Sequence, residues 1–440
     1  MIGRVPVRLV LPVIALALVA ATWFVPEPET AVVAGGSSAV PVRQATWACP
    51  TAPGWTVAAG QVEAGDEAVA RPIPSQAAAD PVWADASRWR TATPGGQALV
   101  LEQSGEGSGP VGFVAGTRGQ AAVLGSCPTV IDEAWFAGLA DEGRTDAVVT
   151  LVNVGESRAV ADLEWWGANG PIQSLDTSGL VVEAGERREI AVDEVAAGEG
   201  AVAVHVSRRR GALTAIALDA GAGRSDLVSP SGGPARSQVI AGLPPGEGTR
   251  VALVNPGTAT AHVAVAVRGP EGSFAAQGLE DVAVEPESTR VVAIPAAVDL
   301  EGASLSVTSD LPVVASATVT DGDIARPVSA VEIAGPAVAP VRMDGRPVRL
   351  TLTTGDDAAE VTIESFSATM QSLGTETVAL APGTSRRAPA AARGAAYVVV
   401  TPADGNAIMA GLWQAGDDKL AAAPLRPAPV TVVAPGVSVR

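Results

Sequence analysis

Histidine, the side chain that most often performs acid–base chemistry, occurs only twice in this 440-residue chain. His205 and His262 each lie within an alternating apolar run, on the face opposite a row of valines. Neither has a serine or acidic partner at a motif spacing, and the sequence has no G-x-S-x-G or H-E-x-x-H pattern. We therefore expect both histidines to be surface strand residues, and we expect no catalytic residue and no enzymatic activity.

Paired carboxylates are the next candidates, because glycoside hydrolysis uses two of them. Asp132-Glu133, Asp356-Asp357 and Asp417-Asp418 all occupy turn-like or domain-start positions, where aspartate commonly caps the backbone. Asp321-Gly322-Asp323 and Asp404-Gly405-Asn406 resemble fragments of a calcium loop but lack its further ligands. These segments are better interpreted as hairpin turns, and we expect neither a metal site nor a cofactor.

Tryptophan is the one unusual resource for binding. Adjacent strand residues point to opposite faces, so if Trp165 and Trp166 share a strand, one ring leaves the core. An outward ring could stack on a sugar or a partner protein, and we take Trp135, Trp165 and Trp166 as candidate binding residues. The alternative is core packing, with one ring covered by a neighbouring domain. The tryptophans of the N-terminal part are Trp47, Trp55, Trp83, Trp89, Trp135, Trp165 and Trp166.

The N-terminus has the pattern of an export signal. Arg4 and Arg8 precede an apolar run from Leu9 to Val25, which matches a basic region followed by a hydrophobic region. The run is close to the shortest length that spans a bilayer, ~17 residues. Residues 1–25 are therefore predicted to be a transmembrane anchor or a cleaved signal peptide, and residues 26–44 a linker. Either way, the rest of the chain is predicted to be exported.

The two cysteines, Cys49 and Cys127, each stand directly before a proline. An even number of cysteines in an exported chain favours a disulfide. Two cysteines without nearby histidines are too few ligands for zinc, and they are too far apart for a C-x-x-C redox motif. We predict a structural Cys49–Cys127 bridge that stabilises by roughly 4 kcal/mol in the chain-entropy description.

Composition restricts the architecture and the partners. A chain of this length exceeds a single hydrophobic core, so several domains are expected. The 48 glycines and 34 prolines supply many turns, and the frequent valines favour strands. The formal net charge of −18 disfavours nucleic-acid binding, which needs basic side chains to replace counterions.

Internal repeats are the strongest signal in the sequence. The run Val149-Thr150-Leu151-Val152-Asn153-Val154-Gly155 recurs as Val251-Ala252-Leu253-Val254-Asn255-Pro256-Gly257, about 100 residues later. Ala-Gly-Leu precedes both copies, at 137–139 and 241–243. A fainter copy opens at Leu350-Thr351-Leu352, and the section that closes each copy occurs four times. The chain is therefore expected to contain an N-terminal variant followed by three fuller copies.

Within the copies the apolar period is two. In 261–267, valines 263, 265 and 267 share one face, and glycine or proline turns recur at short intervals. This pattern predicts an all-β fold of tandem antiparallel β-sandwich repeats, immunoglobulin-like in size, after one N-terminal transmembrane or signal helix. A β-propeller is the architectural alternative. The predicted domains are 45–128, which carries the disulfide, 129–233, 234–337 and 338–440.

Several motifs together resemble a family of uncharacterised actinobacterial envelope proteins. They are the Cys-Pro pair, Ala134-Trp135-Phe136-Ala137-Gly138 and the Leu-Val-Asn-x-Gly repeats. The chain departs from that family where Leu139 stands in place of a further glycine. The resemblance covers most of the predicted exported part. It implies an exported envelope protein with a single anchor, and it implies no activity, substrate or catalytic residue.

These observations predict a non-enzymatic extracytoplasmic envelope protein whose sandwiches act as a spacer and interaction scaffold. One alternative is a module that binds cell-wall glycan through its N-terminal tryptophans, and another is an accessory subunit of an envelope-modifying enzyme. The expected partners are the membrane, through the N-terminal helix, and an envelope protein or glycan, but no nucleic acid. The expected location is the cell membrane, with secretion after signal cleavage as the alternative.

Overall fold

The computed structural model describes residues 38–41, 44–62, 68–73, 89–96, 98–104, 111–295, 300–428 and 431–434. The predicted anchor at 1–25 lies outside these residues, as do residues 26–37, 42 and 43 of the predicted linker. Among the helices of the described part, none has both the length and the apolar character needed to cross a membrane. The chain divides into two units, one of which contains the two-stranded sheet of β1 (Ser38–Pro41) and β36 (Thr431–Ala434).

The other unit, Pro41–Thr431, consists almost entirely of antiparallel strands. In its described part the sheets group into four two-layered sandwiches that follow one another along the chain. The first sandwich has the sheets β2-β6-β4 and β5-β3-β7-β8, with the bounds β2 Gln44–Cys49, β3 Thr56–Gly60, β4 Ala68–Ile73, β5 Arg90–Ala92, β6 Ala98–Ser104, β7 Val111–Arg118 and β8 Ala121–Ser126.

The second sandwich has the sheets β12-β11-β15-β9, with β13 beside β11, and β14-β10-β16-β17. Its strands are β9 Glu133–Leu139, β10 Val148–Asn153, β11 Ala159–Gly167, β12 Gly170–Ile172, β13 Leu180–Val182, β14 Arg187–Ala191, β15 Val202–Arg210, β16 Leu213–Gly221 and β17 Arg224–Val228. The short helix α2 (Val192–Val195) follows β14, and 3₁₀ turns occupy Asp141–Gly143 and Leu175–Thr177.

The third sandwich is linked through β24, which is long enough to run through both of its layers. Its strands are β18 Ala235–Ile240, β19 Gly248–Asn255, β20 Ala261–Gly269, β21 Gly272–Ala275, β22 Val282–Val284, β23 Ser288–Ile294, β24 Ser304–Asp321 and β25 Asp323–Ala325.

The fourth sandwich has the sheets β26-β33-β30-β31 and β32-β29-β34-β35, with β27 and β28 as a small ribbon. Its strands are β26 Ala337–Pro340, β27 Arg342–Met343, β28 Arg346–Pro347, β29 Arg349–Thr354, β30 Ala359–Phe366, β31 Ser372–Leu380, β32 Ser385–Arg387, β33 Tyr397–Pro402, β34 Ile408–Gly416 and β35 Lys419–Pro424.

The period-two pattern places side chains as the sequence predicts. In β20, Val263, Val265 and Val267 are buried, whereas His262 is exposed. The strand order nevertheless differs from that of an immunoglobulin sandwich, whose first, second, fourth and fifth strands share a sheet. In the second sandwich β9 and β10 belong to different sheets, and β10 pairs with β14 and β16. The repeats therefore have the size of immunoglobulin domains but not their strand order.

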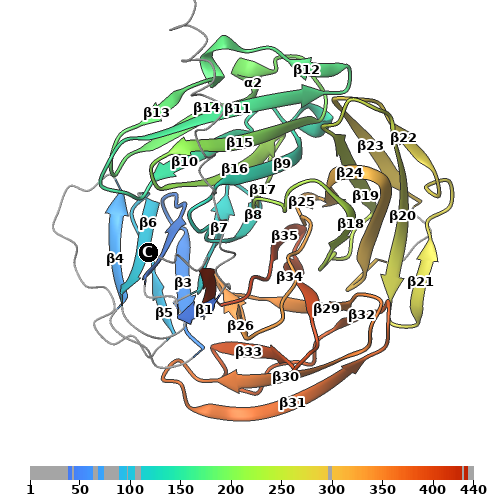
Figure 1. The fold of residues 1–440 in the computed structure, drawn as a ribbon. Coiled ribbons are helices and arrows are strands. Elements are labelled where there is room, and N and C mark those ends of the chain that lie inside the picture. Colours follow the sequence, from blue (N-terminus) through green and yellow to red (C-terminus); the bar gives the residue numbers. More distant parts are fainter. Residues whose placement is uncertain are drawn as a thin grey trace, which may run out of the picture. The chain divides into compact units, whose positions relative to one another are not determined.

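The four sandwiches surround a common centre, where β8, β17, β25 and β35 contact one another (Figure 1). The first and fourth sandwiches meet directly, since Ser126 Oγ donates a hydrogen bond of 2.6 Å to the carbonyl of Pro424. Trp89 of the first sandwich also stacks on Tyr397 of the fourth, at 5.4 Å between ring centroids. The unit Pro41–Thr431 is therefore closed on itself.

One buried carboxylate connects all four sandwiches at this centre. Asp226 of β17 has no exposed surface. Its Oδ1 accepts a hydrogen bond from the backbone amide of Leu124 at 3.0 Å. Its Oδ2 accepts hydrogen bonds from the backbone amides of Arg326 at 2.8 Å and Ala422 at 2.9 Å. Its own neighbour Leu227 donates a fourth hydrogen bond. A side chain of the second sandwich thus holds the backbone of the first, third and fourth.

Asp323 of β25 has a similar role. Its Oδ2 accepts from the amides of Ala122 at 2.7 Å and Leu420 at 3.3 Å, and its Oδ1 accepts from Ser225 at 3.2 Å. Burial raises the pKa of Asp226 well above its ordinary value, and burial also raises the pKa of Asp323. Hydrogen bonds from backbone amides oppose this effect at both carboxyls. These two side chains give the centre its fixed geometry.

The repeated sequence motifs are explained by structural roles. Asn153 accepts from the amide of Gly155 and donates to the carbonyls of Ser157 and Val182, while Asn255 makes the equivalent bonds in the third sandwich. The glycine of each Ala-Gly-Leu copy has a positive φ, 72° at Gly138 and 78° at Gly242. A Cβ at Gly242 would lie 2.7 Å from the backbone of Gly411 in the fourth sandwich. The motifs thus fix loops and allow close contact between sandwiches.

Candidate functional site

Trp165 and Trp166 lie side by side in β11 and point to opposite faces, as strand alternation requires. Trp165 is 2% exposed and belongs to the core between the two sheets of the second sandwich. Trp166 is 7% exposed and packs on the other face, against Ala252 and Val254 of the third sandwich. Neither ring presents an open face for stacking on a ligand, because the neighbouring sandwich covers the outward one.

Trp135 extends this cluster through aromatic contacts. Its ring stacks on Trp166 at 5.2 Å and on His205 at 4.2 Å between centroids. His205 Nδ1 lies 3.0 Å from a carboxylate oxygen of Glu164, and Nε2 lies 3.2 Å from one of Glu133. His205 is therefore held between two carboxylates on β11 and β9, in an arrangement that orients the ring against Trp135.

A polar cavity of about 460 Å³ lies beside this cluster, and we call it the tryptophan cavity. Both Trp165 and Trp166 contribute to its wall, as does Glu287 of the third sandwich. Its volume is within the range of small-molecule sites, and its polar groups are of mixed type. They include carboxylate, amide, hydroxyl and guanidinium groups, from Asp162, Glu164, Gln173, Ser174, Ser207 and Arg209.

Asp162 is the best-anchored polar group of this cavity. It accepts hydrogen bonds from the amide of Gly179 at 2.7 Å and from Ser178 Oγ at 3.0 Å, and it pairs with Arg209. Burial acts to raise the pKa of Asp162, but the hydrogen bonds from Gly179, Arg209 and Ser178 outweigh it and lower that pKa. Asp162 is thus a fixed anionic acceptor.

The chemistry of the tryptophan cavity suits recognition by hydrogen bonds. Glu164 is engaged by His205, and Asp162 by Arg209, so both carboxylates already have partners. Among the described residues, no group of three or more His, Cys, Asp or Glu side chains could hold a metal ion. A ligand rich in hydroxyl groups would find both donors and acceptors here.

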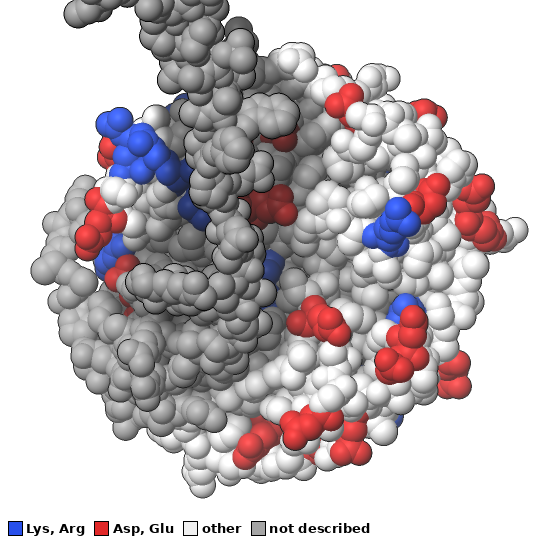
Figure 2. Space-filling model, viewed as in Figure 1, with Lys and Arg blue, Asp and Glu red and all other residues white. Residues whose placement is uncertain are grey.

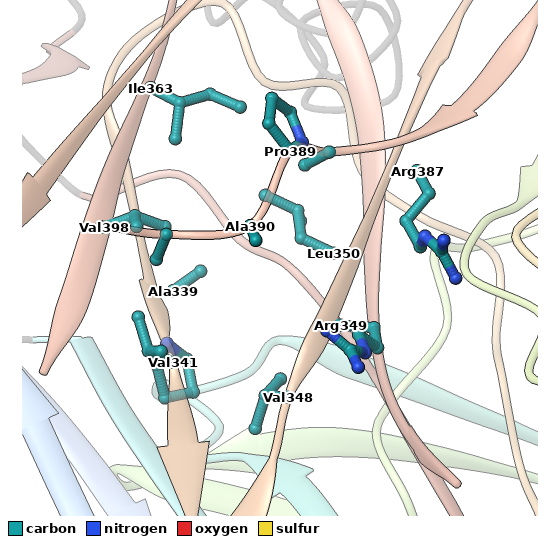
Figure 3. Close-up of a pocket in the computed structure, with 13 residues that line it drawn as sticks. Ala339, Val341, Val348, Arg349, Leu350, Ile363, Arg387, Pro389, Ala390 and Val398 are labelled. Atoms are coloured by element: carbon teal, nitrogen blue, oxygen red, sulfur yellow. The ribbon is translucent and has the colours of Figure 1, made fainter. Parts of the chain in front are cut away.

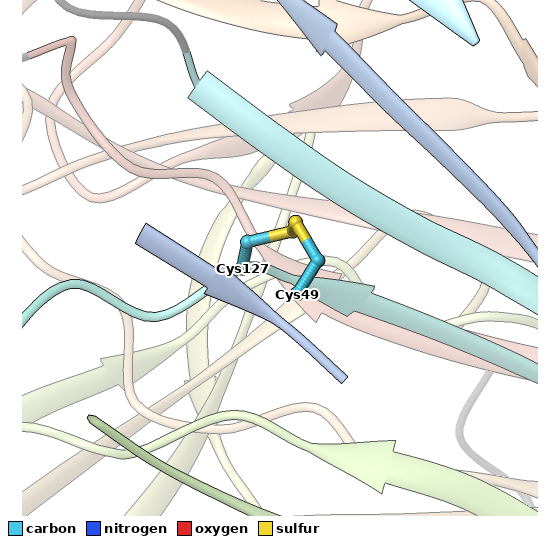
Figure 4. The surroundings of a disulfide bond; sticks show 2 residues. All are labelled: Cys49 and Cys127. Carbon is cyan, nitrogen blue, oxygen red and sulfur yellow. A yellow bond between two sulfur atoms is a disulfide. The ribbon is translucent and has the colours of Figure 1, made fainter. Parts of the chain in front are cut away.

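The predicted disulfide is confirmed. Cys49 at the end of β2 is bonded to Cys127, which follows β8 (Figure 4). Both cysteines are buried, and their separation in sequence is 78 residues. A Cβ at Gly112 would lie 2.8 Å from Cys127 Sγ, so the bridge packs tightly on β7. The bond joins the two sheets of the first sandwich next to the central strand β8.

The remaining titratable residues named from the sequence lie in turns or on the surface. His262 is exposed, and its hydrogen bond with Asp281, 2.8 Å long, raises the pKa of the imidazole. Asp417 and Asp418 form the turn between β34 and β35, each with a φ of 54°. Asp321-Gly322-Asp323 is a hairpin turn as predicted, but the prediction missed the burial of Asp323 and its bonds to the other sandwiches.

Sequence reasoning also missed a buried ion cluster between the second and third sandwiches. Arg144 Nε donates to Asp219 Oδ2 at 3.0 Å, and Arg326 Nη1 lies 3.3 Å from the same oxygen. Burial lowers the pKa of Arg326, and its Nη2 donates to the carbonyl of Ala137. The available signal was a charged residue within an apolar strand, as with Asp219 between Leu218 and Ala220.

On the face of the molecule in view, acidic side chains occur in separate places around the surface (Figure 2). Basic side chains are fewer there, and several of them gather at the upper left of the view (Figure 2).

Comparison with known proteins identifies the family of this chain. No curated protein matches the sequence. A family profile matches residues 90–391, from within the first sandwich to the segment after β32. The matched range contains both Leu-Val-Asn-x-Gly motifs and the tryptophan cavity. The chain therefore belongs to the DUF5719 family, a family of unknown function.

Proposed function

We propose that this protein is a non-enzymatic extracytoplasmic envelope protein, whose four sandwiches form a rigid interaction scaffold. The observation that carries the proposal is the central contact of all four sandwiches through Asp226 and Asp323. A carboxylate that binds backbone amides from three other repeats fixes their relative positions. The outer sheets are then presented as a preorganised surface, which lowers the entropic cost of binding a partner.

The extracytoplasmic location is supported by the buried disulfide, because such bonds form and persist in oxidising compartments. The apolar run from Leu9 to Val25 supports membrane attachment, with secretion after cleavage as the alternative. The resemblance to actinobacterial envelope proteins supports the same location. A single anchor would hold the scaffold close to the outer surface of the membrane.

The location is tested by fractionating cells that express the full chain with a C-terminal tag. Retention of the intact chain in the membrane fraction, with the tag removed by protease added outside spheroplasts, is the expected result. A matched chain lacking residues 1–25 should remain inside the cell. Recovery of the tag only from the culture medium would overturn the anchor, and protection of the tag from protease would overturn the exported location.

The scaffold role is tested by cross-linking in intact cells, followed by purification through the tag. A scaffold should capture one or more envelope proteins in constant ratio, and Asp226→Asn should reduce capture by disturbing the centre. Capture of an envelope-modifying enzyme would make the protein an accessory subunit of that enzyme. Capture unaffected by Asp226→Asn would contradict the claim that the rigid centre presents the binding surface.

A second candidate function is binding of cell-wall glycan, and the tryptophan cavity is the observation that favours it. The cavity combines hydroxyl, amide and carboxylate groups with two tryptophan side chains. Because Trp166 is buried between sandwiches, Trp166→Ala would disturb packing as well as binding. Gln173→Ala is the cleaner probe, since the Gln173 side chain is exposed at the cavity wall.

The test is sedimentation of the full chain with purified wall polysaccharide. Gln173→Ala should weaken binding at least severalfold, whereas Glu156→Ala, an exposed change outside the cavity, should leave it unchanged. Equal binding by both variants would remove the tryptophan cavity as the glycan site.

A further inference from the structure

The fourth sandwich contains a cavity of about 460 Å³ between its two sheets, which we call the aliphatic cavity. Its apolar wall comes mainly from β26, β30 and β33, through Ala339, Ile363 and Val398. Arg349 of β29 and Arg387 of β32 line the other side (Figure 3). The cavity is therefore apolar on one wall and carries two cationic side chains on the other.

Comparison with the second sandwich explains why this cavity exists. Leu151 pairs with Arg188, and Leu352, at the same place in the repeat, pairs with Arg386. Two and four residues after Arg188 stand Ile190 and Val192, both buried in the core of the second sandwich. The corresponding residues of the fourth sandwich are the two alanines 388 and 390, which line the cavity.

The backbone of this segment also differs. In the second sandwich the pairing of β10 with β14 continues to Val148 and Ala191. In the fourth, the ladder of β29 and β32 ends at Thr351 and Arg387, with one further hydrogen bond from the amide of Ala388. Pro389 follows and has no N–H to continue the ladder. The segment therefore leaves the sheet early, and small side chains leave unfilled the space that Ile190 and Val192 fill in the second sandwich.

The two arginines of the aliphatic cavity indicate which class of ligand could bind there. Arg387 pairs with Glu301 at 2.9 Å, whereas the guanidinium of Arg349 has no hydrogen-bond or ion-pair partner among the described residues. A free guanidinium beside an apolar space suits a carboxylate or phosphate attached to an alkyl chain. One helical turn, ~10 Å wide and ~5 Å long, already occupies about 420 Å³, so the Leu9–Val25 segment would not fit as a helix.

We propose that the aliphatic cavity binds the acyl chain of an anionic amphiphile, with its head group at Arg349 and Arg387. The alkyl chain takes the place of the isoleucine and valine that close the second sandwich. Ile363, Val398 and Leu350 are already largely buried, so binding mainly removes the alkyl chain of the ligand from water, and this drives association. The free acid and the phosphate-headed lipid share this chemistry, and competition distinguishes them.

The test is photo-cross-linking of the full chain in isolated membranes, with a dodecanoic acid that carries a diazirine at its chain end. Peptide mapping should place the label in the segments that line the cavity, which are 339–341, 348–350, 388–391 and the strand residues Ile363 and Val398. The double change Ala388→Ile, Ala390→Val restores the side chains of the second sandwich and should reduce labelling at least tenfold. Ala381→Leu, an exposed change outside the cavity, is the matched control and should label normally.

Arg349→Ala tests the head group without touching the core, because Arg349 is exposed. It should reduce labelling about two- to fivefold, which corresponds to the loss of one partly solvated charge interaction. Unlabelled dodecanoate or lysophosphatidate should compete, and the stronger competitor identifies the source. Labelling that is unchanged in the filled variant would overturn the proposal, as would equal competition by dodecylammonium.

Discussion

The centre of the unit Pro41–Thr431 is densely hydrogen-bonded, whereas the outer parts of its sandwiches contain cavities. At the centre, each oxygen of Asp226 and Asp323 accepts two backbone hydrogen bonds, and the packing is shared by all four repeats. Farther out, the tryptophan cavity and the aliphatic cavity leave space between well-packed layers. The difference indicates that assembly and recognition depend on separate residues, so substitutions should separate them as well.

The largest effect on stability is expected from Cys49→Ala combined with Cys127→Ala. The bridge closes a loop of 78 residues next to the central strand β8, and its loss should lower the free energy of unfolding by about 4 kcal/mol. Urea unfolding measures the change, and reduction of the wild-type chain should reproduce it. A decrease below about 1 kcal/mol would show that the core shared by the first and fourth sandwiches holds the first sandwich without its bridge.

Asp226→Asn should have the next largest effect. The amide group replaces one carboxylate oxygen with a donor, so two buried backbone N–H groups lose their acceptor, at a cost of about 2–4 kcal/mol. The exposed change Asp176→Asn is the matched control and should stay within about 0.5 kcal/mol in the same urea experiment. Equal stability of the two variants would remove Asp226 from its central role.

The centre should also make stability depend on pH. Because burial raises the pKa values of Asp226 and Asp323, the folded protein retains protons that the unfolded chain releases above about pH 4. The stability contributed by these groups is complete below that pH and decreases as the pH rises through the folded pKa values. Urea midpoints measured from pH 4 upward should fall for the wild type and fall less for Asp323→Asn. Parallel curves would contradict the pKa shift of Asp323.

The smallest effect on stability is expected at the aliphatic cavity. Ala388→Ile with Ala390→Val adds apolar groups where space already exists, so the free energy of unfolding should change by less than about 1 kcal/mol. Ligand labelling should nevertheless be lost, which is the converse of Asp226→Asn. A large destabilisation would mean that the space in the fourth sandwich is needed for folding.

Much of the local structure could be predicted from the sequence. The alternation of valines correctly predicted which face of β20 is buried. The adjacency of Trp165 and Trp166 correctly predicted that their rings point to opposite faces of β11. The disulfide followed from the count of cysteines and the predicted export. These features depend on period and composition, which act within a single repeat.

The closure of the repeats could not be predicted, because it depends on contacts between residues far apart in sequence. Nothing in the sequence around Ser126 or Pro424 indicates that the two residues are joined by a hydrogen bond between the first and fourth sandwiches. Asp226 and Asp323 appear in turn-rich segments, where aspartate is expected at the surface. The aliphatic cavity could not be predicted for a similar reason. The run of alanines around Pro389 resembles an ordinary loop, and its small side chains become informative only when they are compared with Ile190 and Val192 of the second sandwich.

Hydrogen exchange at the centre tests the account most directly. The amides of Leu124, Arg326 and Ala422 belong to three different sandwiches and all donate to Asp226 in a fourth. In the wild type they should exchange only with global unfolding, and Asp226→Asn should accelerate all three together while amides in the outer strand β31 remain unchanged. Rapid exchange of these amides in the wild type, or acceleration confined to the second sandwich, would contradict the closed arrangement.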